Sequence, residues 1–204
     1  MEMDEIKYDI FKDGALVNGV SIKKILPCIA TKGRIRLTMQ LDSKLEGDVI
    51  PILASKYSPG KISLIPRKNI LTLSDFDRVI TFYPDGKVTM NNTRDQEEAI
   101  EIISGIMEKI NESYLESKDG GPVGEDLSQK LSKIGPLAIY NCLPKTNCEE
   151  CGEVTCLAFA MKLLSGESAL EQCTPLSESK NNGCVNSLRD LLGEQLMKTL
   201  GWNG

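Results

Sequence analysis

Alternating polar and apolar side chains predict β-strands in the first half of the chain. The alternation from Gly33 to Leu41 has a period of two, so we expect a strand whose buried face carries Ile35, Leu37, Met39 and Leu41. Residues 61–73 have the Ile and Leu content of strands. Two further strand-like runs, 79–83 and 87–90, flank Pro84-Asp85-Gly86, which is a turn signal. These two runs are therefore predicted to form a β-hairpin.

Apolar residues recur at helical spacing in two stretches of the same half. Between Lys44 and Tyr57 the spacing predicts a helix, although Pro51 should kink or shorten it. Thr93 with Gln96 three residues later matches a capping box, and one apolar face follows it: Ala99, Ile100, Ile103, Ile106, Met107 and Ile110. We therefore predict a long helix from Thr93 to about Glu112. Together these elements indicate an α+β domain with a mixed or antiparallel sheet and two helices.

A glycine-rich segment that is poor in apolar residues, 118–124, predicts a domain boundary. The chain would then consist of an α+β domain of unknown role at 1–117, a linker, and a second domain at 125–204. The alternative is a long surface loop within one domain. Beyond the linker, we expect amphipathic helices at Glu125–Ile134 and from about Cys184 to Leu200, which makes the second domain small and mainly helical.

The overall charge narrows the classes of partner. The 204 residues have a formal net charge of −5 and no basic stripe, which disfavours nucleic acid and anionic membrane surfaces as partners. No apolar run approaches the roughly 20 residues of a membrane-spanning helix. The first five residues are acidic, unlike the basic start of a signal peptide. We therefore expect a cytoplasmic protein without membrane insertion.

The cysteine and histidine counts point to thiolate chemistry. Five of the seven cysteines fall between Cys142 and Cys173, and no secretory signal is evident, so a disulfide framework is disfavoured. The chain has no histidine, which removes the commonest zinc ligand and general base. It also lacks a phosphate loop, a dinucleotide fingerprint and a recognisable acid–base constellation. A stand-alone enzyme is therefore less favoured than a metal-binding protein.

Four cysteines have the spacing C-x2-C-x4-C-x16-C: Cys148, Cys151, Cys156 and Cys173. Three closely spaced thiolates on a turning loop can ligate three irons of one cluster while a distant fourth completes the site. Gly152 would let the backbone turn sharply after Cys151. A helix predicted at 154–164 would place Cys156 in its first turn, where exposed N–H groups and the helix dipole favour a thiolate.

Two other chemistries could use the same cysteines. A structural zinc site would use all four thiolates, but zinc ribbons usually have two C-x2-C knuckles and this chain has one. A thioredoxin-like dithiol at Cys148 and Cys151 would need a βαβ frame, which the pattern does not indicate. The three remaining cysteines are predicted to be buried apolar thiols, with Cys142 as a possible ligand in an alternative register: Cys28, Cys142 and Cys184.

Residues 140–176 resemble the small four-cysteine [4Fe-4S] domain of the corrinoid iron–sulfur protein large subunit and of Rnf-type B subunits. The similarity lies in LPKTNC, the CG after two residues, the TC, the following Ala-Phe-Ala and the later cysteine. It implies that the cluster ligands are Cys148, Cys151, Cys156 and Cys173. The Asp-x-His-x-x-Gly cobalamin motif requires histidine, so no corrinoid is predicted. Residues 1–120 resemble no family.

The expected function is that of a soluble electron-transfer module whose N-terminal domain docks an unidentified redox partner protein. The alternatives are an iron–sulfur redox or oxygen sensor and an accessory subunit of an enzyme, with a structural zinc protein less favoured. Acidic side chains crowd the cysteine motif and predict a low reduction potential: Glu149, Glu150, Glu153, Glu167 and Glu171.

Overall fold

A computed structural model provides the three-dimensional structure, and it describes residues 6–75, 77–120, 129–131 and 133–203. The chain divides into two compact units. The first comprises Met1–Leu53 and Ser63–Glu125, and the second comprises Ala54–Ile62 and Asp126–Gly204. The linker predicted at 118–124 and the helix predicted at Glu125–Ile134 lie partly outside the described residues; within that predicted helix, residues 129–131 and 133 are helical.

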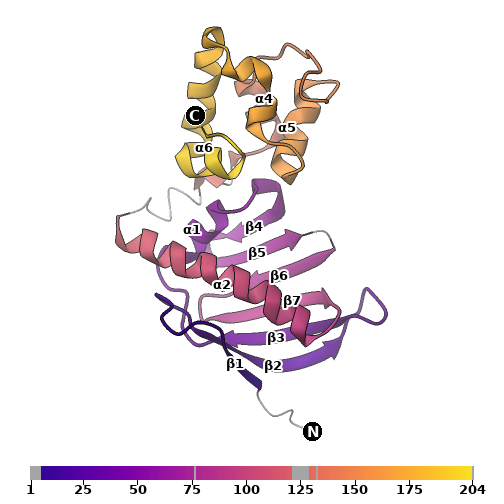
Figure 1. The fold of residues 1–204 in the computed structure, drawn as a ribbon, viewed down its shortest axis with the longest axis vertical. Helices are drawn as coiled ribbons and strands as arrows, with labels where there is room; N and C mark the ends of the chain where they lie inside the picture. The colour runs from indigo at the N-terminus through magenta and orange to yellow at the C-terminus, as the bar shows by residue number, and fades with distance from the viewer. Residues whose placement is uncertain (1–5, 76, 121–128, 132, 204) are drawn as a thin grey trace. The chain divides into compact units, whose positions relative to one another are not determined.

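The first unit is built on a seven-stranded sheet with the order β1-β2-β3-β7-β6-β5-β4 (Figure 1). The pairs β1–β2, β2–β3, β3–β7, β7–β6 and β6–β5 are antiparallel. The predicted hairpin is confirmed, because β6 pairs with β7 across the turn. The strands are β1 (Ile6–Asp9), β2 (Gly19–Pro27), β3 (Ile35–Leu41), β4 (Ile62–Ile65), β5 (Ile70–Asp75), β6 (Arg78–Phe82) and β7 (Lys87–Thr93).

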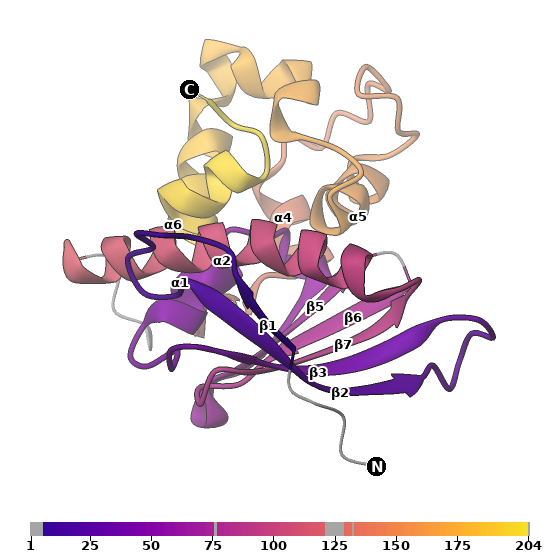
Figure 2. The same ribbon diagram turned by 60° about the horizontal axis from the view of Figure 1, so that its bottom comes forward.

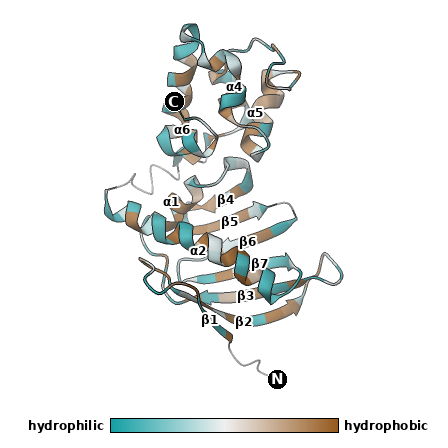
Figure 3. Cartoon of the chain, in the orientation of Figure 1, coloured by the Kyte–Doolittle hydropathy of each residue, from teal (hydrophilic) through white to brown (hydrophobic). Residues whose placement is uncertain are grey.

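One long helix, α2 (Gln96–Lys118), lies across one face of this sheet (Figures 1 and 2). The alternation predicted for β3 is confirmed for Leu37, Met39 and Leu41, which are buried, whereas Ile35 at the start of the strand is half-buried. The apolar face of α2 contributes the other side of the core through Ala99, Ile103, Met107 and Ile110. Figure 3 shows the mixture of apolar and polar positions along the strands and α2 that produces this two-layer packing.

The start of α2 differs from the prediction, because its N-cap is Asp95 and not Thr93. The Asp95 carboxylate accepts a hydrogen bond from the Glu98 N–H at 2.8 Å, and the Glu98 carboxylate accepts one from the Arg94 N–H at 2.7 Å. The Asp95 half of this arrangement is that of a capping box, two residues later than expected, whereas Glu98 accepts from the residue before the N-cap. The Arg94 N–H is the main cause of a lowered Glu98 pKa, and three guanidinium groups lower it further: Arg78, Arg94 and Arg34.

The second unit includes the helices α4 (Pro136–Cys142), α5 (Cys156–Ser165) and α6 (Asn182–Thr199). Three short 3-10 turns connect α5 to α6: η3 (Leu170–Gln172), η4 (Thr174–Ser177) and η5 (Ser179–Asn181). Helix α6 is interrupted at Gly193, whose φ is 75°. No helix within the described ranges is both long and apolar enough to cross a membrane. The α+β class with a small helical unit is confirmed.

A segment from the first half of the chain, 54–62, belongs to the second unit. It begins at the end of α1 (Val49–Ser55), a helix shorter than predicted. Pro51 occupies the first turn of α1, where the missing N–H of proline leaves no helical hydrogen bond unmade. The Thr199 hydroxyl donates to the Ser55 carbonyl at 2.9 Å. Gly60 lies so close to α5 that a Cβ there would be 2.7 Å from the Leu164 carbonyl oxygen. The domain division predicted from the sequence did not include a segment of the first half of the chain in the second domain.

Replacing Gly60 with alanine should therefore destabilise the second unit. The added methyl group would collide with backbone, which cannot move without disturbing α5, and such overpacking costs roughly 1–3 kcal/mol. Gly105→Ala is the matched control, because Gly105 lies on α2 with open space around it and should gain about 0.5–1 kcal/mol. Denaturant unfolding measures both changes. Equal midpoints for Gly60→Ala and the wild type would contradict the packing of 54–62 against α5.

Candidate metal centre

All four cysteines of the motif line one small cavity in the second unit. Cys148 and Cys151 lie on the loop between α4 and α5, Cys156 is the first residue of α5, and Cys173 lies between η3 and η4. Cys148 is exposed, Cys151 is half-buried, and Cys156 and Cys173 are buried. The cavity therefore has a solvent-facing side at Cys148 and a buried side at the other end, where Phe159 and Pro175 complete the wall.

The loop that carries the first two cysteines adopts left-handed backbone conformations at several positions. Lys145, Asn147 and Glu149 have φ values of 58°, 48° and 63°, and Gly152 has a φ of 84°. The left-handed region costs most residues other than glycine roughly 1–2 kcal/mol. The Gly152 N–H donates to the Glu149 carbonyl at 2.9 Å, which closes a turn around Cys151. The sharp turn predicted at Gly152 is confirmed, and successive turns of this kind direct N–H groups toward an anion.

Asn147 joins this loop to the start of α5. Its side-chain oxygen accepts a hydrogen bond from the Cys156 N–H at 2.9 Å, and its own N–H donates to the Cys156 sulfur at 3.4 Å. Thr155, the N-cap, accepts from the Ala158 N–H at 3.1 Å. The predicted position of Cys156 in the first turn is confirmed. The motif analysis did not identify Asn147. The sequence signal for its role was an asparagine, a residue that tolerates left-handed φ, directly before a cysteine of the motif.

The four thiols influence one another electrostatically. Burial raises the pKa of Cys173 to about 11, the Leu176 N–H opposes this shift, and the neighbouring charges of Cys151, Cys156 and Cys148 raise the pKa further. Cys173 is therefore a neutral thiol at physiological pH in the metal-free protein. A metal bound at the cavity would have to displace that proton, because thiolates are the ligating form.

The acidic residues near the motif do not act as one group. Glu153 is paired with Lys162 at 2.6 Å, which raises the lysine pKa. Glu167 accepts a hydrogen bond from Ser165, and Glu171 accepts one from the Asn203 side chain. Glu149 and Glu150 are exposed on the cysteine loop itself. Of these five acids only Glu153 has a lysine partner among the described residues, since the neutral donors leave the charges of Glu167 and Glu171 in place, and Glu149 and Glu150 add two charges on the cysteine loop itself.

The three other cysteines do not line this cavity. The Cys142 thiol donates to the Ala138 carbonyl at 3.4 Å, and its pKa is raised by burial and by Cys184. Cys28 belongs to the first unit, where N–H groups, chiefly that of Thr31, lower its pKa. All three are half-buried, whereas the sequence predicted buried thiols. The structure thus gathers the four cysteines of the motif and leaves the others outside the cavity.

Residues 143–175 match the model of a protein family described as "Putative Fe-S cluster". The second unit therefore contains a small iron–sulfur domain, and the predicted resemblance is confirmed. No solved structure gives a significant match to the chain.

Relatives with established names share the same stretch. The chain is 50% identical over 48 residues, 24% of this chain, to "Acetyl-CoA decarbonylase/synthase complex subunit gamma" of Methanocaldococcus jannaschii. It is 53% identical over 45 residues, 22% of this chain, to subunit gamma 2 of that complex from Methanosarcina thermophila. It is 56% identical over 43 residues, 21% of this chain, to "Corrinoid/iron-sulfur protein large subunit" of Moorella thermoacetica. The match spans 10% of each of these relatives.

Replacing Asn147 should loosen the cysteine loop. Asn147→Ala removes the acceptor for the Cys156 N–H and places a less tolerant residue in the left-handed region, so the free energy of unfolding should fall by about 1–2 kcal/mol. Asn147→Gly keeps the backbone freedom and should lose less. Asn141→Ala is the control, because the Asn141 side chain accepts an exposed hydrogen bond from Lys145. Equal denaturant midpoints for all three variants would contradict the role of Asn147.

Proposed function

We propose that this chain binds a [4Fe-4S] cluster through Cys148, Cys151, Cys156 and Cys173 and acts as an electron-transfer module. The observation that carries the proposal is that these four thiols, which come from three separate places in the second unit, line one cavity. The iron–sulfur domain matched at 143–175 includes all four. The donor set also fits such a group, since thiolates are the usual ligands of iron–sulfur clusters.

We infer a cluster of several irons and not a single zinc ion, because the chain has one C-x2-C knuckle and zinc ribbons usually have two. A tetrahedral zinc ion with bonds of about 2.3 Å would draw its sulfur ligands to within roughly 4 Å of one another. Across the described part of the chain, no group of three or more cysteine, aspartate or glutamate side chains is arranged to hold one metal ion. A larger inorganic core would accommodate more widely spaced thiols around a shared cavity, and the Asn147 N–H already donates to one of them.

A cluster held here would take up and release a single electron. The residues of the chain would control its surroundings, since Phe159 and Pro175 wall the buried side and exclude water there. The exposed Cys148 marks the side from which another protein could approach within electron-transfer distance. The names of two relatives denote subunits of a multiprotein complex, which supports a protein partner for this chain too.

We further propose that the α+β domain at 1–117 docks the redox partner and that the segment 118–124 links it to the iron–sulfur domain at 125–204. The cytoplasm is the proposed location, because all seven cysteines are free thiols and a reducing compartment keeps them so. No corrinoid and no nucleic acid is part of this proposal.

The exposure of Cys148 also favours a second candidate function, that of an iron–sulfur sensor of redox state or oxygen. A ligand at the solvent-facing side leaves that edge of a cluster open to oxidants. A reversible redox titration without loss of iron would support the electron carrier. Breakdown of the cluster in air, together with altered partner binding, would support the sensor.

Alanine substitution of each proposed ligand tests the cluster assignment. Replacing any of the four with alanine should abolish or convert the cluster and loosen the second unit, because metal binding and folding are coupled. Iron and acid-labile sulfide analysis after anaerobic purification, followed by EPR of the reduced protein, measures the outcome and separates iron from zinc. Cys28→Ala and Cys184→Ala are the controls and should keep full iron content. Iron loss in Cys142→Ala with retention in Cys148→Ala would show that the ligand register is wrong.

The two exposed glutamates should lower the reduction potential. Changing Glu149 and Glu150 to glutamine should raise the midpoint by roughly 10–30 mV for each charge removed at low ionic strength, as expected for solvated charges several ångströms away. Glu46→Gln is the control, since Glu46 is an exposed acid of the first unit. An EPR-monitored titration gives the midpoints. No shift at low salt would show that these carboxylates are fully screened.

A further inference from the structure

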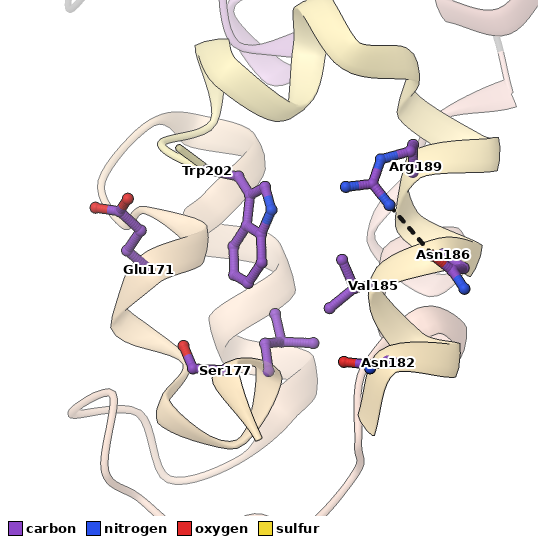
Figure 4. Close-up of a pocket in the computed structure, with 8 residues that line it drawn as sticks. Glu171, Ser177, Asn182, Val185, Asn186, Arg189 and Trp202 are labelled. Atoms are coloured by element: carbon purple, nitrogen blue, oxygen red, sulfur yellow. Dashed lines mark hydrogen bonds between the residues drawn. The ribbon is translucent and has the colours of Figure 1, made fainter. Parts of the chain in front are cut away.

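The second unit has a further pocket, of about 650 Å³, which no part of the proposed electron transfer uses (Figure 4). Its volume lies within the usual range for small-molecule sites, roughly 300–1,000 Å³. The walls come from α6, from the chain after α6, and from the segment that includes η3 and η4. The lining residues are Glu171, Leu176, Ser177, Asn182, Val185, Asn186, Arg189 and Trp202.

Main-chain hydrogen bonds hold the wall that carries Trp202, the single tryptophan of the chain. The Trp202 N–H donates to the Met197 carbonyl at 2.9 Å. The Leu170 N–H donates to the Leu200 carbonyl at 2.8 Å and ties this segment to η3. The backbone that carries the indole is therefore held in place, and a held wall lowers the entropic cost of binding.

Two hydrogen-bond donors in the pocket lack partners. The indole Nε1 of Trp202 is buried and has no hydrogen-bond partner, although buried tryptophans usually have one. Arg189 contacts Glu194 through Nε at 2.6 Å and Asn186 through Nη1 at 3.2 Å, which leaves Nη2 without a partner among the described residues. Figure 4 shows the nitrogen edge of the indole turned toward α6, from which Arg189 extends back toward it.

We propose that this pocket binds a small organic monocarboxylate with an apolar body. The Trp202 Nε1–H and the Arg189 guanidinium supply the two donors that a carboxylate accepts. Leu176, Val185 and the face of the indole supply apolar contact for the body. Glu171 is engaged by Asn203 at 2.8 Å, and its presence beside a single cation disfavours dianions such as phosphate.

The pocket shares one wall with the cysteine cavity. Within η4, Pro175 lines the cavity of the four cysteines, whereas Leu176 and Ser177 line this pocket. A carboxylate that packs against Leu176 would therefore stabilise the turn that follows Cys173. This coupling rests on the proposed function, whereas carboxylate binding itself does not.

Titration of the purified full-length chain with benzoate tests the binding site, with Trp202 fluorescence as the readout. Benzoate combines a carboxylate with an apolar ring, so the fluorescence change should saturate. Benzyl alcohol lacks the charge and acetate lacks the ring. The affinity of each should be lower than that of benzoate by a factor of about ten or more. Absence of saturation by benzoate, or equally tight binding of benzyl alcohol, would overturn the proposal.

Variants of the two donors test the assignment by calorimetry. Arg189→Met and Trp202→Phe should each weaken benzoate binding about tenfold, because each removes one donor to the carboxylate. Glu194→Gln is the matched comparison: it removes a carboxylate that competes for Arg189 without changing the pocket lining, so benzoate should bind at least as tightly as to the wild type. An unchanged benzoate affinity in Arg189→Met would contradict the proposed binding site. Because the Arg189 side chain is partly exposed, this variant allows the test even if Trp202→Phe unfolds.

The coupling is tested separately from the binding. Saturating benzoate should slow the loss of iron to a chelator several-fold in the wild type and have no effect in Arg189→Met. An unchanged rate in the wild type refutes the coupling. Because such coupling is reciprocal, loss of the cluster in Cys148→Ala should weaken benzoate binding by the same several-fold factor. If the wild-type protein contains no iron but binds benzoate, the cluster proposal fails while the carboxylate site stands.

Discussion

Two hydrogen bonds between Asn147 and Cys156 hold together the loop and helix start that carry three of the four cysteines. They attach a loop with several left-handed residues to the first turn of α5, and this attachment carries Cys148 and Cys151 toward Cys156. Unfavourable backbone conformations persist only where their surroundings compensate for them. Here the compensation is local, because the side chain of Asn147 satisfies an N–H at the helix start that would otherwise lack an acceptor. The position of the fourth thiol, Cys173, then depends on how η3 and η4 pack and on the hydrogen bond from the Leu170 N–H to the Leu200 carbonyl.

The features that local chemistry determines could be predicted from the sequence. The period-two pattern of Leu37, Met39 and Leu41 identified a strand because one face of β3 is buried and the other is not. The turn at Gly152 was predictable because few residues other than glycine adopt its φ. The cysteine spacing indicated a shared site, and the structure places all four at one cavity. In each case the cause lies within a few residues of the signal.

Features that depend on tertiary context were missed. A bulge in β2 between Ile22 and Lys24 breaks the alternation, so the strand had no clear pattern in the sequence. Thr93 and Asp95 are both acceptable N-caps, and only the pairing of β7 with β3 assigns Thr93 to the sheet. The Trp202 pocket is formed by residues separated in the sequence, and none of them belongs to a recognisable motif.

The membership of 54–62 in the second unit has a consequence for dissecting the protein. The chain passes from the first unit to the second after Leu53, returns at Ser63 and passes again after Glu125. A fragment that starts at residue 126 would keep every cysteine of the motif but would expose the surface of α5 that Gly60 covers. The iron–sulfur unit is therefore discontinuous in the gene, and transplanting it into another protein would require both pieces of chain.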